Sequence, residues 1–198
     1  VTTFHGTYNF SSKIKHFYNS VMVRSKLIIG GSNFIFGHIN ENYQKYLNHK
    51  KQKLLVVFRG INLEFFNEKN TSEKKVNELA TNWNIDRKNF VILLPGRLTR
   101  WKGQEVFIEA LNLLVEENTN QNFHAIVLGS NQGRDVYSKK LLLLVERYRL
   151  GKKITFIENC KEMPLAYKLS NLVVSSSIEP EAFGRVAVEA QAMNKPIV

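Results

Sequence analysis

The second part of the chain alternates short apolar runs with longer runs of helical period, and this alternation limits the fold more than any other feature. Strands are predicted at residues 90–94, 123–128, 153–157 and 171–175. Helices are predicted at residues 72–83, 103–118, 134–149, 162–169 and 183–193. Because apolar strands separated by helices form a parallel sheet covered on both faces, we predict an α/β fold. Ligands of such sheets bind beyond the carboxyl ends of the strands.

The first 60 residues contain the elements of another, smaller region. The chain starts with what resembles the end of a strand, and further strands are predicted at residues 27–30 and 54–58. Ser32 is a predicted N-cap for the helix that follows the first of these. Arg59-Gly-Ile-Asn62 is predicted to be a turn at a domain junction, which divides the chain into residues 1–60 and 61–198.

Residues 11–26 are predicted to form an amphipathic helix. Its apolar stripe either packs on a core or, with the cations around it, touches an anionic bilayer surface. Both interpretations remain open at this point. The stripe consists of Ile14, Phe17, Tyr18, Val21 and Met22.

Charge is distributed unevenly between the two regions. Residues 1–60 contain nine Lys or Arg and one acid, a net charge of +8, whereas residues 61–198 contain nineteen and sixteen, a net charge of +3. This imbalance favours an anionic partner for the first region, or else only a solvated basic face. Nucleic acid is disfavoured as that partner, because no zinc-finger spacing and no RNP-type aromatic signature is present.

The composition places the chain in a reducing compartment and outside the bilayer. Cys160 is the single cysteine, so no internal disulfide can form. No run of about 18 apolar residues is present, and the first residues lack the features of a signal peptide. We expect a cytoplasmic location, with peripheral contact on the inner face of the membrane as the alternative that the basic region suggests. Both ends look cut, so we expect a piece of a longer protein.

The first segment with binding chemistry is Gly96-Arg-Leu-Thr-Arg-Trp-Lys-Gly103, which follows a predicted strand. Gly96 allows a close turn after the strand. Arg97 offers a planar fork and Lys102 a mobile point charge, and both can hold phosphate oxygens. Gly103 opens a predicted helix whose free N–H groups add positive potential. The alternative is a loop that carries solvated cations only.

The second such segment is Glu181-Ala-Phe-Gly-Arg-Val-Ala-Val-Glu189. Glu181 precedes a predicted helix, where the helix dipole favours an acid whether or not it binds a ligand. A turn at Phe183-Gly184 separates it from the apolar helical run. Glu189 lies on that helix, either on its exposed face, which is commoner for glutamate, or buried with a partner. Two carboxylates near strand ends are suited to binding sugar hydroxyls.

Together these residues resemble a known family. Glu181 and Glu189 match the Glu-x7-Glu motif of retaining glycosyltransferases with the GT-B fold, of the glycogen-synthase-like and lipopolysaccharide-mannosyltransferase-like group 1 family. Gly96-Arg97 and Lys102-Gly103 are similar to its phosphate-binding segment. His5 resembles its histidine near the end of the first domain. The resemblance implies two Rossmann-like domains, with residues 1–60 ending the acceptor-side domain and residues 61–198 forming an incomplete donor-nucleotide domain.

The resemblance also implies a role for each matching residue. Arg97 and Lys102 would hold the diphosphate of a nucleoside-diphosphate sugar after the turn at Gly96. Glu181 would bond hydroxyls of the donor sugar, helped by the backbone of Phe183-Gly184, and Glu189 would bond the ribose. His5 would position the donor at the reacting centre. The catalytic residues would thus be His5 and Glu181, and the acceptor would be a sugar or a lipid-linked or envelope compound.

No metal or other cofactor is expected. The chain contains two aspartates, Asp86 and Asp135, which are far apart, so no Asp-x-Asp pair is available to hold Mg²⁺. Arg97 and Lys102 would replace the metal. The resemblance implies transfer with retention of configuration in cell-envelope or polysaccharide biosynthesis, although this piece alone would catalyse poorly. The alternatives are a sugar-nucleotide epimerase and a non-catalytic α/β module that binds phosphate or nucleic acid.

Overall fold

The computed structural model describes residues 1–7, 12–117 and 122–198. Its contacts divide it into two compact units. Unit 1 comprises Val1–Gly60 and Pro180–Gly184, and unit 2 comprises Ile61–Glu179 and Arg185–Val198. The two-domain division of the whole protein after residue 60 stays a prediction.

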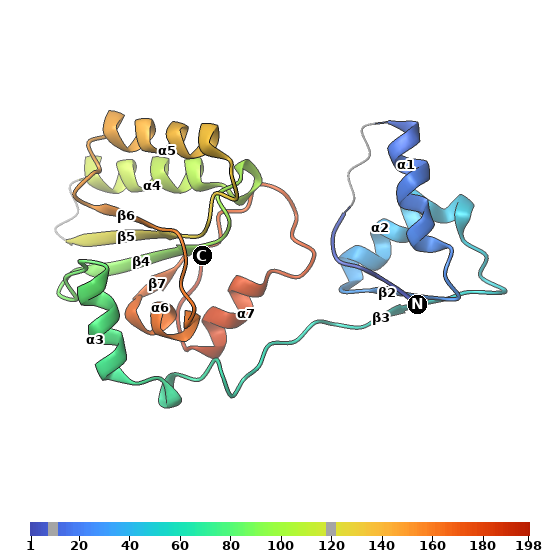
Figure 1. Ribbon diagram of the computed structural model, residues 1–198, viewed down its shortest axis with the longest axis horizontal. Helices are drawn as coiled ribbons and strands as arrows, with labels where there is room; N and C mark the ends of the chain where they lie inside the picture. Colours follow the sequence, from blue (N-terminus) through green and yellow to red (C-terminus); the bar gives the residue numbers. More distant parts are fainter. Residues whose placement is uncertain (8–11, 118–121) are drawn as a thin grey trace. The chain divides into compact units, whose positions relative to one another are not determined.

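Unit 2 is built on a parallel sheet with helices on both faces (Figure 1). The strands lie in the spatial order β6-β5-β4-β7. An isolated parallel bridge between Val173 and Ile197 extends the pairing beyond β7. In chain order the elements are η3 (Glu68–Asn70), α3 (Glu73–Asn82), β4 (Phe90–Pro95), η4 (Arg100–Lys102), α4 (Gln104–Glu116), β5 (Phe123–Leu128), α5 (Asp135–Arg147), β6 (Ile154–Ile157), α6 (Met163–Leu169), β7 (Leu172–Val173) and α7 (Arg185–Ala192).

Alternate residues of the unit 2 strands enter two separate apolar cores. On β4, Val91 and Leu93 belong to the core that α3, α6 and α7 cover. Ile92 and Leu94 belong to the core beneath α4 and α5. This period of two is the one that side chains of a strand follow, and it explains why the strand sequences are almost continuously apolar. The predicted α/β fold with a covered parallel sheet is confirmed.

The predicted elements of unit 2 are present, with shifted ends. The helix predicted at residues 183–193 begins at Arg185, because Gly184 has φ +73° and a left-handed residue cannot continue a right-handed helix. The helix predicted to reach residue 149 ends at Arg147, since Arg149 has φ +55°. The strand predicted at residues 171–175 is shorter, Leu172–Val173, although the backbone N–H groups of Val174 and Ser175 still donate to the carbonyls of Leu93 and Val198. The next residue, Ser176, bonds to the segment after β4.

Unit 1 contains a three-stranded parallel sheet in the order β1-β2-β3. Its helix α2 begins after Ser32, whose side chain accepts a hydrogen bond from the backbone N–H of Ile35, so the predicted N-cap is confirmed. The core of the unit contains Phe4, Ile28 and Ile39. The elements are β1 (Thr2–Phe4), α1 (Lys13–Asn19), η1 (Ser20–Val23), β2 (Leu27–Gly30), α2 (Asn33–Tyr43), η2 (Gln44–Tyr46) and β3 (Lys53–Val56).

The helix predicted over residues 11–26 is shorter and divided into α1 and η1, and residue 11 lies outside the described residues. Most of its apolar stripe does not pack on a core, although Met22 packs against the core of unit 1. Ile14 is 81% exposed, Tyr18 76% and Phe17 57%. The segment is anchored by His16, which stacks on the ring of Tyr43, and at its C-terminal end by buried Val23. Of the two interpretations of the stripe, core packing holds for Met22 and is wrong for the exposed residues Ile14, Phe17 and Tyr18.

Candidate functional site

The unit 2 sheet reverses its direction of growth at one place. β5 and β6 follow β4 on one side, whereas β7 lies against the other side of β4. In open α/β sheets, ligands bind beyond the carboxyl ends of the strands at such a point. The segments that follow β4 and β7 are residues 96–103 and 174–184. They contain most of the residues that the sequence singled out.

The segment after β4 presents two cations beside a helix N-terminus. The aliphatic chain of Lys102 lies across Gly96, with Cδ 3.5 Å from where a Cβ of residue 96 would stand. The Lys102 ammonium lies over the Trp101 ring, 4.4 Å from its centre. Arg97 is exposed, and among the described residues no carboxylate pairs with its guanidinium. Because α4 starts at Gln104, its N-terminal N–H groups add positive potential here.

The segment after β7 clamps this loop from the other side. Gly103 has φ +69°, and a Cβ on it would stand 1.8 Å from the carbonyl oxygen of Ser176. The Ser176 hydroxyl donates to the carbonyl oxygens of Lys102 and Gly103, at 3.1 and 3.0 Å. The backbone N–H of Ile178 donates to the Trp101 carbonyl at 2.8 Å. Glycine is therefore required at residue 103 both for its backbone conformation and for this close approach.

Two side chains that the sequence did not suggest fix the backbone of Arg97. The Gln104 amide, 1% exposed, donates to the Arg97 carbonyl at 2.8 Å. The Tyr137 hydroxyl donates to the other end of the same amide, at 3.2 Å from Oε1. Burial raises the pKa of Tyr137 to about 12, so the hydroxyl keeps its proton. The contact between Tyr137 and Gln104 joins residues 33 positions apart, so it leaves no trace in periodicity or local spacing.

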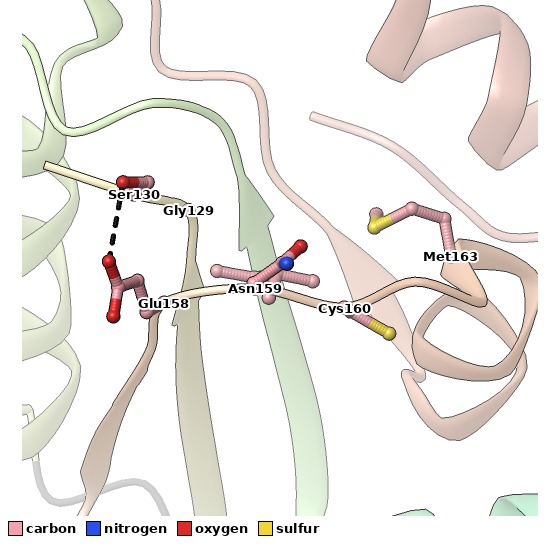
Figure 2. A pocket seen from close by; sticks show the side chains of 7 residues that line it. Gly129, Ser130, Glu158, Asn159, Cys160 and Met163 are labelled. Carbon is pink, nitrogen blue, oxygen red and sulfur yellow. Dashed lines mark hydrogen bonds between the residues drawn. The ribbon is translucent and has the colours of Figure 1, made fainter. Parts of the chain in front are cut away.

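A pocket of about 570 Å³ opens at the carboxyl ends of β5 and β6 (Figure 2). At one end Ser130 and Glu158 face each other, 3.5 Å apart. Gly129 brings the pocket next to the loop after β4, because a Cβ on it would stand 2.1 Å from the Gly96 carbonyl oxygen. Burial raises the pKa of the Cys160 thiol, so this residue lines the pocket as a thiol. The lining residues are Leu128, Gly129, Ser130, Glu158, Asn159, Cys160 and Met163.

The two glutamates of the second segment fall in different units. Glu181, Phe183 and Gly184 belong to the Pro180–Gly184 segment of unit 1, and all three are partly buried. Glu189 belongs to unit 2 and is 6% exposed. Its carboxylate accepts a hydrogen bond from the Tyr167 hydroxyl at 2.8 Å and pairs with Arg185 at 2.7 Å. Of the two predicted environments for Glu189, the structure therefore has the buried one with partners.

His5 lies in unit 1, directly after β1 and therefore at the carboxyl end of a parallel strand. Its side chain is exposed. Its predicted role concerns a donor bound by unit 2, so that role stays a prediction.

Two features of the described residues concern metals and membranes. In residues 1–7, 12–117 and 122–198, no group of three or more His, Cys, Asp or Glu side chains gathers as a metal site would require. Over the same residues, no helix combines the length and apolar character needed to cross a bilayer. The expectations about metal use and location stay predictions.

Comparison with known proteins gives a consistent result. The family model "Glycosyl transferases group 1" matches residues 75–198. A glycosyltransferase from Rickettsia africae has a similar structure, with TM-score 0.83 and 33% identity over 99% of this chain and 50% of its own. The Anabaena protein HepE, solved with UDP and glucose, gives TM-score 0.79 at 24% identity, over 98% of this chain and 51% of its own.

A curated relative agrees with the structural neighbours. D-inositol 3-phosphate glycosyltransferase of Corynebacterium glutamicum is 25% identical over 86% of this chain and 41% of its own length. The chain thus spans about half the length of the relatives it matches. The family model covers well over half of the chain, and the parallel sheets superpose on those of glycosyltransferases with the GT-B fold. The chain belongs to the glycosyl transferases group 1 family and has the α/β architecture of the GT-B fold.

Proposed function

We propose that the intact protein transfers a sugar from a nucleoside-diphosphate sugar to an acceptor, with retention of configuration. The observation that carries this proposal is the loop 96–103, where Arg97, Lys102 and the N-terminus of α4 converge at the point where the sheet reverses direction. Breaking the bond between sugar and phosphate leaves negative charge on the diphosphate. Fixed cations stabilise that charge as it develops.

The contacts around the loop support a preorganised diphosphate site. Gln104 fixes the Arg97 carbonyl, and Ser176 fixes the carbonyls of Lys102 and Gly103. The backbone that carries both cations is therefore held before a ligand arrives, so little reorganisation is needed on binding. Arg97 contributes a fork that can engage two phosphate oxygens, and Lys102 contributes a point charge.

We place the base and sugars of the donor around this loop. The pocket lined by Ser130, Asn159 and Cys160 adjoins the loop and is large enough for a planar base. Glu189, which lies on α7 with its carboxylate buried, would bond the ribose, as the family resemblance implies. Glu181, the backbone of Phe183-Gly184 and His5 keep the roles that the family resemblance implies, at the donor sugar and the reacting centre.

Neither a metal ion nor another cofactor is needed in this proposal. Two cations at the diphosphate supply the positive charge that Mg²⁺ supplies in many transfer reactions. Both cations are present in the loop 96–103, on a backbone fixed by hydrogen bonds.

We also propose a cytoplasmic enzyme that meets a lipid-linked or envelope acceptor at the inner face of the membrane, in polysaccharide biosynthesis. The support lies in α1 and η1, where exposed Ile14, Phe17 and Tyr18 lie among the cations of a region with net charge +8. Apolar contact and attraction to anionic lipid act together on such surfaces.

The release of nucleoside diphosphate from a sugar donor tests the function. Intact protein should release it with acceptor present, and EDTA should not stop the release. Arg97→Ala and Lys102→Ala should each weaken nucleoside-diphosphate binding in calorimetric titration by about 1.5–3 kcal/mol, as for a lost charge-assisted contact. Arg100→Ala removes a neighbouring exposed cation and serves as the matched control, with affinity close to the wild type.

Other outcomes would point to other functions. Glu181→Gln should slow release while leaving nucleoside-diphosphate affinity nearly intact. An epimerase would convert the sugar nucleotide without releasing nucleoside diphosphate, and a binding module would do neither. Unchanged affinity in both the Arg97 and Lys102 variants would reject the diphosphate site. Loss of activity in EDTA that Mg²⁺ restores would reject metal independence.

A further inference from the structure

The Glu189 carboxylate has two partners of opposite character. Oε2 accepts a hydrogen bond from the Tyr167 hydroxyl at 2.8 Å, and Oε1 lies 2.7 Å from a guanidinium nitrogen of Arg185. The carboxylate itself is buried, with 6% of the residue exposed. All three residues belong to unit 2. A buried carboxylate must be paired or hydrogen-bonded, so the two partners account for its presence in the core.

Tyr167 is the fixed partner. It is fully buried on α6, within the core that lies between that helix and the sheet. Its ring meets Phe66 edge to face, with ring centres 6.1 Å apart. Burial, and next the charge of Glu189, raise the pKa of Tyr167 well above the usual range, so its hydroxyl remains a donor at any working pH. The Tyr167 hydroxyl can move away from Oε2 only if the ring shifts, and a shift of the ring would disturb the core.

Arg185 is the exchangeable partner. It is the first residue of α7, and its side chain is 64% exposed. Because its guanidinium is largely in water, Arg185 can move away from Oε1 without disturbing the core. The buried carboxylate then needs another donor at Oε1, and a ligand hydroxyl can supply it. The two carboxylate oxygens therefore differ. Oε2 is held by a buried hydroxyl, whereas Oε1 faces a cation that a ligand can replace.

We propose that Tyr167 is a positioning residue that holds Glu189 through Oε2, so that Oε1 exchanges Arg185 for a hydroxyl of the donor's ribose. The proposal rests on the proposed function, because it takes Glu189 as the ribose ligand. It deepens that function by assigning the ribose selectivity of the site to a hydroxyl that never touches the nucleotide. Without the Tyr167 hydroxyl, the carboxylate would lose its fixed orientation. The hydrogen bond from the ribose hydroxyl to Oε1 would then be weaker, because its acceptor would no longer be held in place.

The test compares ribose with deoxyribose. Calorimetric titration of the intact protein would use uridine diphosphate, or the nucleoside diphosphate that binds best, and its 2′-deoxy and 3′-deoxy forms. We expect wild type to prefer the ribonucleotide over at least one deoxy form by on the order of tenfold, as for one hydrogen bond to a charged acceptor. Tyr167→Phe, which removes only the hydroxyl, should reduce this preference to about twofold or less. Tyr148→Phe is the matched control and should keep it.

The remaining outcomes separate the two hypotheses. If wild type shows no ribose preference, or if Glu189→Gln keeps it, Glu189 is not the ribose ligand and that part of the proposed function fails. If Glu189→Gln loses the preference and Tyr167→Phe keeps it, the role of Tyr167 alone is rejected.

Arg185→Met provides a second variant that leaves the core intact. It should bind the ribonucleotide at least as tightly as wild type and keep the preference, because Oε1 no longer has a cation to release. Loss of the preference in this variant would transfer the positioning role to Arg185 and overturn the proposal.

Discussion

The two sheets differ in how many of their faces the described chain covers. In unit 2, the two faces of β4 enter two separate cores, one under α3, α6 and α7 and one under α4 and α5. In unit 1, Ile28 and Leu54 face the core that α2 helps to form, whereas Leu55, on the opposite face of β3, is 46% exposed. Parallel sheets are normally buried on both faces. One face of the unit 1 sheet is therefore less covered than either face of the unit 2 sheet.

The two units also differ in how tightly their loops are held and in what their surfaces expose. Unit 2 holds its loops with backbone contacts that leave no space for a side chain, as at Gly103 and Gly129. Unit 1 carries the exposed stripe of α1 and most of the net positive charge. Because stabilisation scales with apolar area removed from water, we expect unit 2 to be the more stable unit and unit 1 to be the one that depends on further contacts.

The largest expected effect lies in the clamp between the segments after β4 and β7. Gly103→Ala should destabilise unit 2 by at least about 3 kcal/mol, because its Cβ would overlap the Ser176 carbonyl and its backbone is left-handed. Gly133→Ala is the matched control. It has φ +77° but no atom within 4 Å, so it should cost only about 1–2 kcal/mol. The measurement is urea unfolding followed by tryptophan fluorescence.

Fluorescence is suited to this test because both tryptophans, Trp83 and Trp101, belong to unit 2. Amide exchange in β1, β2 and β3 would report unit 1 separately. Gly103→Ala should lower the fluorescence midpoint without accelerating that exchange. Equal costs for the two glycine variants would mean that the clamp is looser than the backbone distance implies, and the contrast between the units would weaken.

Periodicity predicted the strands and helices of unit 2 because side-chain patterns of period 2 and 3.6 are local. It could not predict the clamp, since Gly103 and Ser176 are 73 residues apart and a serine in a loop carries no pattern. The same holds for Tyr167, whose bond to Glu189 spans 22 residues. An apolar stripe at helical spacing predicted the helix at α1 but not its exposure, because exposure depends on what the rest of the fold places beside it. The roles of the site residues stay predictions.

An intermediate effect is expected at the exposed stripe of unit 1. Intact protein should sediment with anionic vesicles at low salt, and binding should fade as salt rises, because each cation near the surface contributes on the order of 1 kcal/mol and is screened. Lys13→Glu, or Ile14→Ser with Tyr18→Ser, should reduce recovery. Lys139→Glu makes the same charge change on exposed α5 of unit 2 and should not. Equal recovery with neutral and anionic vesicles would show only a solvated basic face.

The smallest expected effect is the dependence of each unit's stability on pH. Burial lowers the pKa of His38 in unit 1 and of His124 in unit 2. Lys153 lowers the pKa of His124 further, whereas Glu41 partly restores that of His38. Each folded-state pKa therefore lies below the value of about 6.5 for an unfolded chain. As pH falls below about 6.5, the histidine becomes protonated in the unfolded chain before it does in the folded one. The free energy of unfolding therefore decreases between that pH and the lower pKa of the folded state.

Because both influences on His124 lower its pKa, this imidazole should make unit 2 lose stability on acidification. Urea unfolding at pH 7.5 and at pH 5.5, followed by fluorescence for unit 2 and by amide exchange for unit 1, measures the two slopes. His124→Gln cannot titrate and retains a side chain able to hydrogen-bond Thr155, which lies 2.8 Å from the imidazole Nε2. It should flatten the unit 2 slope and leave the slope of unit 1, and hence the contribution of His38, unchanged. An unchanged slope of unit 2 in this variant would mean that His124 does not carry the acid sensitivity of that unit.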